Sequence, residues 1–298
     1  MVEVAFEDGV TDSRLTLPGG RVIAWTEHGL ADGTPMLRLP GTPGCRWSLG
    51  AGDRSRFTRR GLRVITTERP GMGASTRLPG RGFNEHADDL AVLLDHLGIE
   101  SAYITGGSGG APYVLAFIAR HGDRAKAATI QVGAAPLEES DTIGMVEINR
   151  RGWELARAGD RDAMREFMLP FYEAMVADPV AGLRAAIADA SDDDRAAMED
   201  EEWQAGIAKG IFEALNGNLE GWIDEAIANE LGWDDIDFDA ITTSVTWWHG
   251  RTDALSPIVA VERLIARIPG AVLRELDGEG HIGSGHDEEI LDELLARG

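Results

Sequence analysis

The sequence predicts an α/β protein with a mostly parallel sheet of eight strands, covered by helices on both faces. Three observations support this fold class. Short runs rich in β-branched and aromatic residues alternate with helical patterns along most of the 298 residues. A glycine cluster, 106–110, joins one predicted strand to the helix that follows it. An acidic, helix-patterned segment, 137–240, interrupts the alternation once and predicts an insertion.

The strands are predicted from short apolar runs that end at glycine, proline or aspartate. The first two runs are separated by Gly19-Gly20, which is typical of a hairpin between antiparallel strands. Most of the later runs are followed by a helical pattern, and strands connected through helices are expected to be parallel neighbours. The eight predicted strands cover residues 14–17, 21–26, 35–39, 63–67, 102–104, 127–132, 244–248 and 271–275.

The helices around the sheet are predicted from apolar spacing and from the residues at their ends. Four leucines between residues 90 and 97 have the i, i+3, i+4, i+7 spacing of one buried helical face, and Gly98 follows as a stop. Pro257 suits the first turn of another helix. The five predicted helices outside the insertion cover residues 48–60, 84–97, 112–119, 257–267 and 287–297.

The acidic segment 137–240 is predicted to be a helical cap inserted into the sheet domain. It holds 27 acidic and 8 basic residues, whereas the rest of the chain holds 24 and 20. This shift in composition divides the chain into a core, residues 1–136 and 241–298, and the cap between them. Its aromatic residues are expected to form the cap core and, in part, a substrate pocket. The run Asp192-Asp193-Asp194 is expected to be the solvated N-terminus of a helix capped by Ser191.

The overall composition indicates a globular protein and argues against a nucleic-acid partner. The formal net charge is −23, and phosphate backbones are bound by clustered lysine and arginine. No apolar run reaches the ~18 residues of a membrane span. The first eight residues carry acid where a signal peptide carries base, which predicts a cytoplasmic protein without membrane contact. Cys45 is the single cysteine and is expected to be a small buried residue.

The glycine cluster Gly106-Gly107-Ser108-Gly109-Gly110 allows two chemical interpretations. A P-loop needs a lysine directly after its last glycine, and the two lysines of the chain, Lys126 and Lys209, lie elsewhere. The dinucleotide-binding pattern G-x-G-x-x-G does not fit the cluster either. The cluster does match G-x-S-x-G between a strand and a helix, where a sharp turn exposes a nucleophilic serine. We therefore predict that Ser108 is a nucleophile.

A serine nucleophile needs a base and an acid that orients the base, in the chain order serine, acid, histidine. Asp253 and His281 follow Ser108 in that order, and each comes just after a predicted strand. The carboxyl ends of parallel strands share one edge of a sheet, so the three residues are expected to meet at that edge.

Other residues compete for these two roles. His249 lies four residues before Asp253 and is the main rival as the base. Glu138 and Asp141 follow the predicted strand 127–132 and offer another position for the acid. The chain has no H-E-x-x-H or His-x-x-x-His spacing and no cysteine cluster, so no metal site is expected.

Three further segments make the chain similar to the α/β-hydrolase superfamily over nearly its whole length. Residues 39–44 (LPGTPG) resemble the oxyanion loop of that family, 68–75 (ERPGMGAS) its D-R-P-G-x-G-x-S segment, and 248–253 (WHGRTD) its loop bearing the acid. The resemblance implies that Ser108 is the nucleophile, His281 the general base and acid, and Asp253 the residue that orients His281. It also implies an oxyanion hole formed by the backbone N–H groups of Thr42 and Gly109.

Two positions depart from the family's pattern. Pro40 replaces the usual histidine before the oxyanion-loop glycine, and Glu68 replaces the commoner aspartate. The resemblance implies cofactor-free hydrolysis of an ester, lactone or related acyl bond of a small molecule through an acyl-enzyme. The alternatives are a lyase, a perhydrolase, a C–C hydrolase, an amidase or aminopeptidase on the same triad, and a non-catalytic binder of small ligands.

Overall fold

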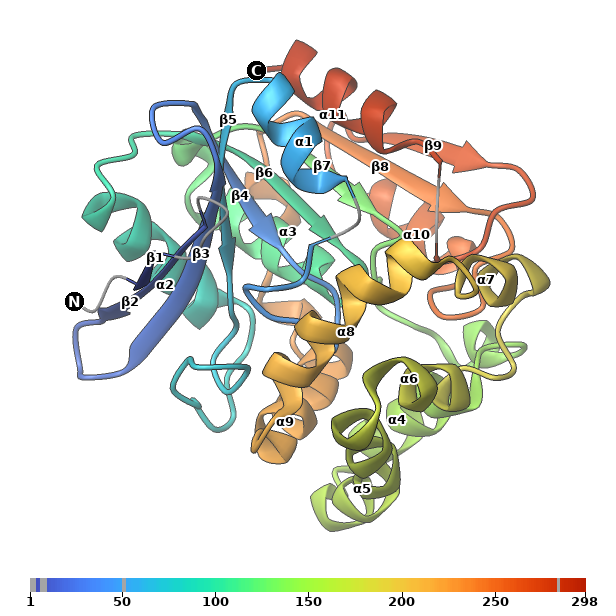
Figure 1. Ribbon diagram of the computed structural model, residues 1–298. Helices are drawn as coiled ribbons and strands as arrows, with labels where there is room; N and C mark the ends of the chain where they lie inside the picture. Colours follow the sequence, from blue (N-terminus) through green and yellow to red (C-terminus); the bar gives the residue numbers. More distant parts are fainter. Residues whose placement is uncertain (1–3, 6–9, 50–51, 283–284) are drawn as a thin grey trace.

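The computed structural model describes residues 4–5, 10–49, 52–282 and 285–298. These residues form one sheet with the strand order β1-β2-β3-β5-β4-β6-β7-β8-β9 between layers of helices (Figure 1). The eight predicted strands are all present, and the two-residue β1 extends the sheet at one edge. The strands are β1 (Val4–Ala5), β2 (Thr11–Thr16), β3 (Val22–Gly29), β4 (Thr34–Leu39), β5 (Leu62–Thr67), β6 (Ala102–Gly107), β7 (Ala125–Gln131), β8 (Val245–Gly250) and β9 (Val272–Leu276).

The sheet is parallel from β5 to β9 and antiparallel at its other end. β2 and β3 pair as the predicted hairpin, with Arg14 opposite Ala24. β4 lies between β5 and β6, and Leu37 is level with Ile65 on one side and Ile104 on the other. Because β4 to β9 run in one direction, their carboxyl ends form one edge of the sheet. The loops after β4, β6, β8 and β9, which carry the predicted site residues, therefore lie along the same edge.

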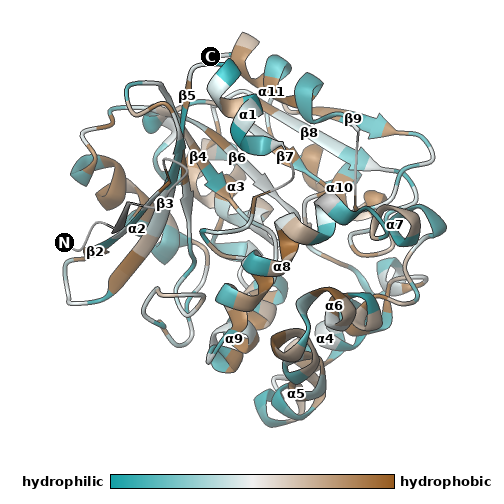
Figure 2. Cartoon of the chain, in the orientation of Figure 1, coloured by the Kyte–Doolittle hydropathy of each residue, from teal (hydrophilic) through white to brown (hydrophobic). Residues whose placement is uncertain are grey.

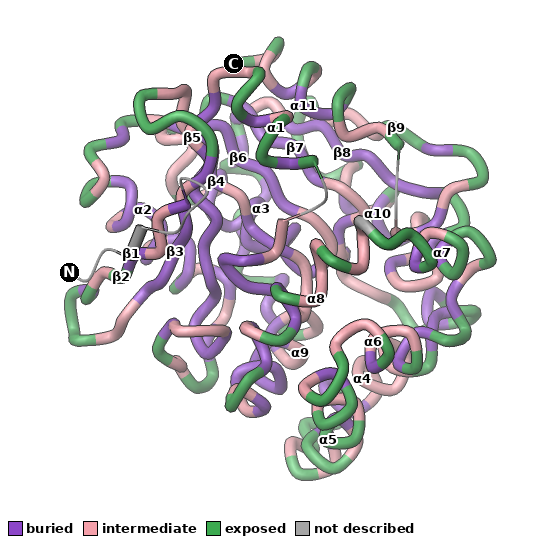
Figure 3. The backbone as a smooth tube through the Cα atoms, in the orientation of Figure 1, coloured by how far each residue is buried: buried purple, intermediate pink, exposed green. Residues whose placement is uncertain are grey.

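Successive residues of the central strands point to opposite faces of the sheet, and residues of both faces are buried. Figure 3 shows the central strands as mostly buried. Met36 and Val64 pack in a small core with α1 and α11, whereas Leu37 and Ile65 belong to the larger core with α2, α3 and α10. The predicted cover of both faces is confirmed. The covering helices are α1 (Asp53–Arg59), α2 (Asn84–His96), α3 (Ala111–Arg120), α10 (Ile258–Ile265) and α11 (Asp287–Ala296).

One predicted helix is shorter than expected. The range 48–60 becomes helical only from Asp53, in α1, and its residues 50 and 51 lie outside the described part of the chain. Gly52 has a φ of 71°, a left-handed conformation that glycine adopts readily, and it separates the helix from the preceding turn. Within the described ranges, no helix has the length and apolar character needed to cross a membrane.

The helices between β7 and β8 in the chain lie together below the sheet in Figure 1, with α7 at its right-hand side. Their apolar faces form a second hydrophobic cluster that includes Met164, Ile211 and Trp222. In Figure 2, α5 and α8 carry both hydrophobic and hydrophilic residues, as partly exposed helices do. After α9 the chain returns to the sheet, because Trp233 and Phe238 pack in the larger core. The helices are α4 (Glu147–Ala158), α5 (Arg161–Ala177), α6 (Pro179–Ala186), α7 (Asp192–Ala197), α8 (Glu201–Leu215) and α9 (Leu219–Leu231).

Candidate active site

Ser108 lies in a sharp turn between β6 and α3. Its φ of 50° is in the left-handed region, which residues other than glycine seldom adopt. A Cβ atom on Gly106 would lie 2.6 Å from a methyl carbon of Val114, and one on Gly110 would lie 2.3 Å from the backbone oxygen of Leu39. A side chain is excluded at Gly106 because β6 and α3 pass so close, and at Gly110 because the turn lies against the end of β4. The turn therefore has the strand–turn–helix geometry that the glycine cluster predicts.

Ser108, His281 and Asp253 lie together at the carboxyl ends of β6, β9 and β8. His281 Nε2 is 2.9 Å from Ser108 Oγ, and His281 Nδ1 is 2.7 Å from Asp253 Oδ2. The other carboxylate oxygen of Asp253 accepts the backbone N–H groups of Leu255 and Ser256, each at 2.8 Å. The three predicted residues thus form one hydrogen-bonded chain that can carry a proton from the serine hydroxyl to the histidine ring.

The surroundings of Asp253 and His281 favour an ionised acid and a basic ring. Burial opposes ionisation of Asp253, but His281 and His249 hold the pKa of its carboxyl well below the usual range. Burial also disfavours the charged form of His281, but Asp253, with a further contribution from Asp194, raises the pKa of the ring above its ordinary value. A ring of this kind is suited to accept the proton of Ser108.

His249, the rival base, has other partners. Its side chain is fully buried, and its Nδ1 accepts the indole N–H of Trp247 at 3.2 Å. Its Nε2 lies 2.7 Å from the carbonyl oxygen of Ser256 and 3.3 Å from Asp253 Oδ2. His249 therefore lies beside the same oxygen of Asp253 that contacts His281, and none of its contacts reaches Ser108.

Glu138 and Asp141, the rival acids, lie in and next to a 3-10 turn, Glu139–Thr142. Asp141 Oδ2 accepts the backbone N–H of Glu138 at 2.8 Å. Both carboxylates also pair with Arg263 of α10. These contacts occupy the two carboxylates, and the acid that bonds the His281 ring is Asp253.

The loop after β4 is held by charged side chains that sequence reasoning missed. Arg69 donates to the carbonyl oxygens of Pro40 and Gly41, the latter at 2.8 Å. It also donates to Thr42 Oγ1 at 3.1 Å. The Thr42 hydroxyl in turn donates to Glu225 Oε1 at 2.7 Å. Pro40, which stands where the family has a histidine, is compatible with an ordered loop because its carbonyl oxygen is bound in this way.

Glu225 of α9 is the centre of this charged network. Its side chain is fully buried and forms ion pairs with Arg69 and Arg81. Tyr113 donates its hydroxyl to Glu225 Oε2 at 3.0 Å. Burial opposes ionisation, but the two guanidinium groups lower the pKa of the carboxyl below its ordinary value. Glu225 therefore remains charged and connects α9 to the loop that carries Thr42.

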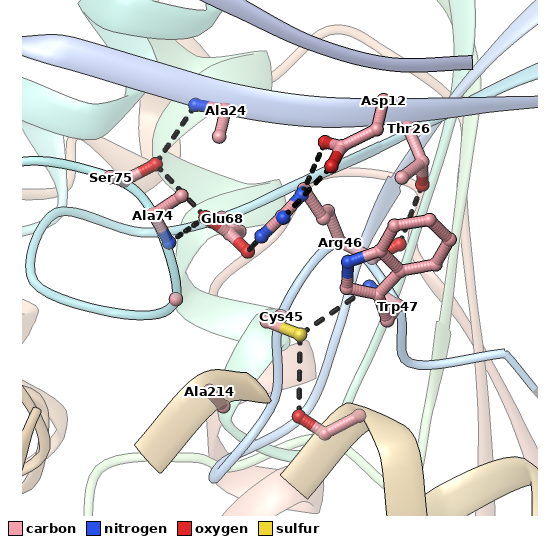
Figure 4. Close-up of polar contacts among 12 residues, drawn as sticks. Asp12, Ala24, Thr26, Cys45, Arg46, Trp47, Glu68, Ala74, Ser75 and Ala214 are labelled. Atoms are coloured by element: carbon pink, nitrogen blue, oxygen red, sulfur yellow. Dashed lines mark hydrogen bonds and ion pairs between the residues drawn. The ribbon is translucent and has the colours of Figure 1, made fainter. Parts of the chain in front are cut away.

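A second buried network lies behind the same loop (Figure 4). Glu68 is fully buried and pairs with Arg46, which also donates to Asp12 Oδ1 at 2.6 Å. The glutamate that replaces the family's aspartate thus keeps a charged partner. Cys45 lies beside this network, and its thiol donates to a carbonyl oxygen of α8 at 3.2 Å. Burial raises the pKa of the Cys45 thiol, in agreement with the prediction of an unreactive buried residue.

A pocket of about 160 Å³ opens at Ser108 between the sheet edge and the inserted helices. Thr42 and Gly109 line it together with Ser108. The two residues touch, because a Cβ atom on Gly109 would lie 2.4 Å from Thr42 Oγ1. Much of the remaining lining is large and apolar, and it includes Trp153, Met164, Phe167, Met168, Met175 and Trp222.

Two polar residues of α9, Asn229 and Glu230, line this apolar pocket and were not singled out from the sequence. Asn229 Nδ2 lies 3.1 Å from the place of a Cβ atom on Gly109, while its Oδ1 is buried without a hydrogen-bond partner among the described residues. Glu230 forms no hydrogen bond or ion pair with any residue that the structure describes, and burial raises its pKa to about 8. Trp222, Ala226, Asn229 and Glu230 follow the i, i+4, i+7, i+8 spacing of one helical face. This spacing is the sequence signal that could have located the two polar residues.

The acidic run at the start of α7 contacts the loop that carries His281. Ser191 caps the helix as predicted, because its Oγ accepts the backbone N–H of Asp194 at 3.1 Å. The expectation of a solvated run is wrong for Asp194, which is fully buried and accepts the backbone N–H of His281 at 2.6 Å. The spacing Ser-x-x-Asp indicates the cap, but it carries no information on this second contact.

Comparison with known proteins agrees with this geometry. A family model described as alpha/beta hydrolase fold matches residues 34–285. A non-heme haloperoxidase of Rhodococcus erythropolis is 26% identical over 228 residues, which cover 76% of this chain and 77% of the relative. A proline iminopeptidase of Neisseria meningitidis serogroup A is 27% identical over 296 residues, which cover 92% of this chain and 90% of the relative.

Solved structures share the fold at lower identity. The enol-lactonase from Burkholderia xenovorans LB400 is 18% identical, with a TM-score of 0.66, over 95% of this chain and 100% of that one. A carboxylesterase from the Thaumarchaeon Nitrososphaera gargenis is 20% identical, with a TM-score of 0.64, over 95% and 97%. The family model spans well over half of the chain, so the resemblance found in the sequence motifs is confirmed. The chain belongs to the α/β-hydrolase family.

Proposed function

We propose that this α/β-hydrolase cleaves an ester, lactone or related acyl bond of a small molecule through an acyl-enzyme on Ser108. The observation that carries the proposal is the hydrogen-bonded chain from Ser108 Oγ through His281 to the ionised Asp253. It lies where the pocket opens, so a carbonyl group in the pocket can reach the serine oxygen.

In the proposed reaction, Ser108 Oγ attacks the carbonyl carbon while His281 Nε2 takes the hydroxyl proton. The negative charge that develops on the carbonyl oxygen is stabilised by the backbone N–H groups of Thr42 and Gly109. The start of α3 lies directly behind this position and adds the favourable potential of a helix N-terminus. The C–O bond then breaks, His281 returns the proton to the leaving oxygen, and the acyl group remains on Ser108.

The second half of the reaction uses the same groups with water in place of the alcohol. His281 takes a proton from water as its oxygen attacks the acyl carbon, and the acid leaves when Ser108 Oγ regains the proton. Asp253 keeps the proton on Nδ1 of the ring throughout, so that Nε2 faces the reacting atoms.

The oxyanion loop is prepared for this role before substrate binds. Arg69 binds the carbonyl oxygens of the loop just before Thr42, and Arg69 and Glu225 both bind the Thr42 hydroxyl. These bonds hold the loop in one arrangement. A preorganised N–H donor of this kind contributes about 2.7–4 kcal/mol to transition-state stabilisation. The pocket volume of about 160 Å³ favours an acyl group of modest size. The methionines that line the pocket have flexible thioether side chains, which adapt to apolar ligands of differing shape.

The test combines a serine-directed fluorophosphonate with a panel of acyl esters, lactones and amides. We expect the wild type to be labelled once, and Ser108→Ala to lose both labelling and ester turnover. Ser55→Ala, which changes an exposed serine of α1, is the matched control and is expected to behave as the wild type. Failure of the folded wild type to be labelled would reject the hydrolase and favour a non-catalytic binder.

Glu230 favours a second candidate, in which the acyl group carries a free amine. Burial in an apolar pocket raises the pKa of the Glu230 carboxyl to about 8, although the charge of Arg157 acts in the opposite direction. An ammonium group beside Glu230 would favour the charged carboxylate and form an ion pair with it. A relative named proline iminopeptidase covers most of the chain, which is compatible with an aminoacyl substrate.

The second candidate is tested with one arylamide or ester in free-amine and N-acetylated forms. We expect Glu230→Gln to lower kcat/KM by about 10-fold to 100-fold for the free amine alone, as for a lost charge-assisted hydrogen bond. An equal loss for both forms would argue against amine recognition and leave the simple acyl ester as the substrate class.

A further inference from the structure

The loop that carries His281 is hydrogen-bonded to the inserted segment at three consecutive residues. The N–H of Gly280 donates to Asp193 Oδ2 at 3.0 Å. The N–H groups of His281 and Ile282 both donate to Asp194 Oδ1, each at 2.6 Å. Both aspartates belong to the first turn of α7, at the right of Figure 1. A helix of the insertion therefore holds the backbone of the residue whose ring contacts Ser108.

The Asp194 side chain is also held within its own helix. Its side chain is fully buried, and Ser191 Oγ donates to Asp194 Oδ2 at 2.7 Å. A Cβ atom on Gly280 would lie 2.6 Å from both carboxylate oxygens of Asp194, so the loop backbone and the carboxylate are in direct contact. Both oxygens thus have donors, and the carboxylate is rigidly placed against the loop.

From these contacts we propose that Asp194 is a positioning residue for His281, and that this base is aligned with Ser108 only while α7 is docked on the loop. The insertion then does more than shape the pocket, because it holds part of the catalytic machinery in place. Undocking of α7 frees the three N–H groups of residues 280–282 together. The His281 ring then keeps its contacts with Asp253 and Ser108, but the backbone that carries the ring loses its contacts with α7. The role of His281 as the base rests on the proposed function, whereas the contact itself does not.

Asp194 acts on His281 in two ways that substitutions can separate. Its Oδ1 atom accepts the backbone N–H of His281 and so holds the loop, and its negative charge favours the protonated form of the His281 ring. Asp194→Asn keeps an oxygen for the two N–H groups but removes the charge, whereas Asp194→Ala removes both. Loss of the charge lowers the pKa of His281, so the ring stays neutral, and active as a base, to lower pH. The other charged or titratable groups around His281 are Asp253, Asp193 and His249, with Arg38, Asp53 and Asp287 in the neighbouring hollow.

The activity test measures kcat and KM for an aryl ester across pH. We expect Asp194→Ala to lower kcat by about 10-fold to 100-fold with KM changed by less than about threefold. We expect Asp194→Asn to lose less and to move the acidic limb of kcat/KM to lower pH. Asp192→Asn is the matched control, since Asp192 lies in the same turn with a side chain that is 95% exposed, and it is expected to match the wild type.

Two measurements test the contact without turnover. Hydrogen exchange of the amides of residues 280–282 is expected to be about tenfold faster or more in Asp194→Ala, and unchanged in Asp192→Asn. The His281 ring, followed by NMR, is expected to titrate at lower pH in Asp194→Asn. A wild type that exchanges slowly at these amides but turns over no ester would reject the proposed function and retain the contact. Unchanged exchange in folded Asp194→Ala, or an unchanged titration in Asp194→Asn, would overturn the proposal.

Discussion

Replacing Asp253 with asparagine removes one negative charge from the site while leaving the shape of the side chain almost unchanged. In the wild type, one oxygen of Asp253 faces His281 Nδ1 at 2.7 Å, and the other accepts two backbone N–H groups at 2.8 Å. Those two N–H groups will hold the oxygen of the asparagine amide, so its NH2 group turns toward His281. An NH2 group donates, which requires an unprotonated Nδ1 and places the ring proton on Nε2. Nε2 then cannot accept the proton of Ser108.

The size of the effect follows from this geometry. The lost hydrogen bond to a buried charge contributes about 1.5–3 kcal/mol, and the ring must also change tautomer before it can act. Together these costs correspond to a loss of about 10³-fold to 10⁴-fold in kcat, or roughly 4–5.5 kcal/mol at 1.36 kcal/mol for each factor of ten. KM is expected to change little, because Asp253 does not line the pocket at Ser108.

The assay is steady-state hydrolysis of an aryl ester at pH 8, with circular dichroism to verify the fold of each variant. Asp141→Asn is the matched control, since it neutralises the rival acid that pairs with Arg263. Asp141 is buried, but it lies outside the hydrogen-bonded chain of Ser108, His281 and Asp253. We therefore expect kcat of this control to remain within about twofold of the wild type, with any cost appearing in stability. Retention of more than a tenth of the activity by Asp253→Asn, with loss of activity in Asp141→Asn, would refute the reasoning.

The remaining predictions concern stability and pH. Glu225→Gln should lower the free energy of unfolding by about 3–5 kcal/mol in urea titrations, because it leaves buried guanidinium groups without their charge partner, and a change under about 1 kcal/mol would contradict this. Gly110→Ala should destabilise by more than about 2 kcal/mol, since its Cβ meets a backbone oxygen, whereas Gly152→Ala in open space within α4 should be neutral or stabilising. The raised pKa of His281 places the acidic limb of kcat/KM above pH ~6.5, with activity rising as the ring loses its proton, and a limb below pH ~6 would contradict the assigned base.

The residues of the hydrogen-bonded chain could be singled out from the sequence because each has a local signal. Ser108 stands in a glycine pattern that only a tight strand-to-helix turn requires, and Asp253 and His281 each follow a strand pattern. Parallel strands bring their carboxyl ends to one edge, so three local signals are enough to predict a meeting in space. The structure places the three side chains within hydrogen-bond distance.

The residues that support Ser108, His281 and Asp253 could not be predicted, because their contacts join distant elements and no local sequence pattern marks such a contact. Glu225 reaches Thr42 across 183 positions, and Asp194 reaches His281 across 87. In the sequence, Asp194 is one of three identical neighbours, and only the docking of α7 decides that it is the buried one. The pocket lining could not be predicted either, since the direction of the side chains from the inserted helices depends on how those helices pack.

The most direct test of the account is the mass of the peptide that contains Ser108 after reaction with a slowly hydrolysed aryl ester. The wild type is expected to carry one acyl group on Ser108 when the reaction is stopped with acid during turnover. Ser108→Ala is expected to carry none and to release no product above the uncatalysed rate. Turnover of the ester by Ser108→Ala, or by a wild type whose acyl group lies on another residue, would contradict the account.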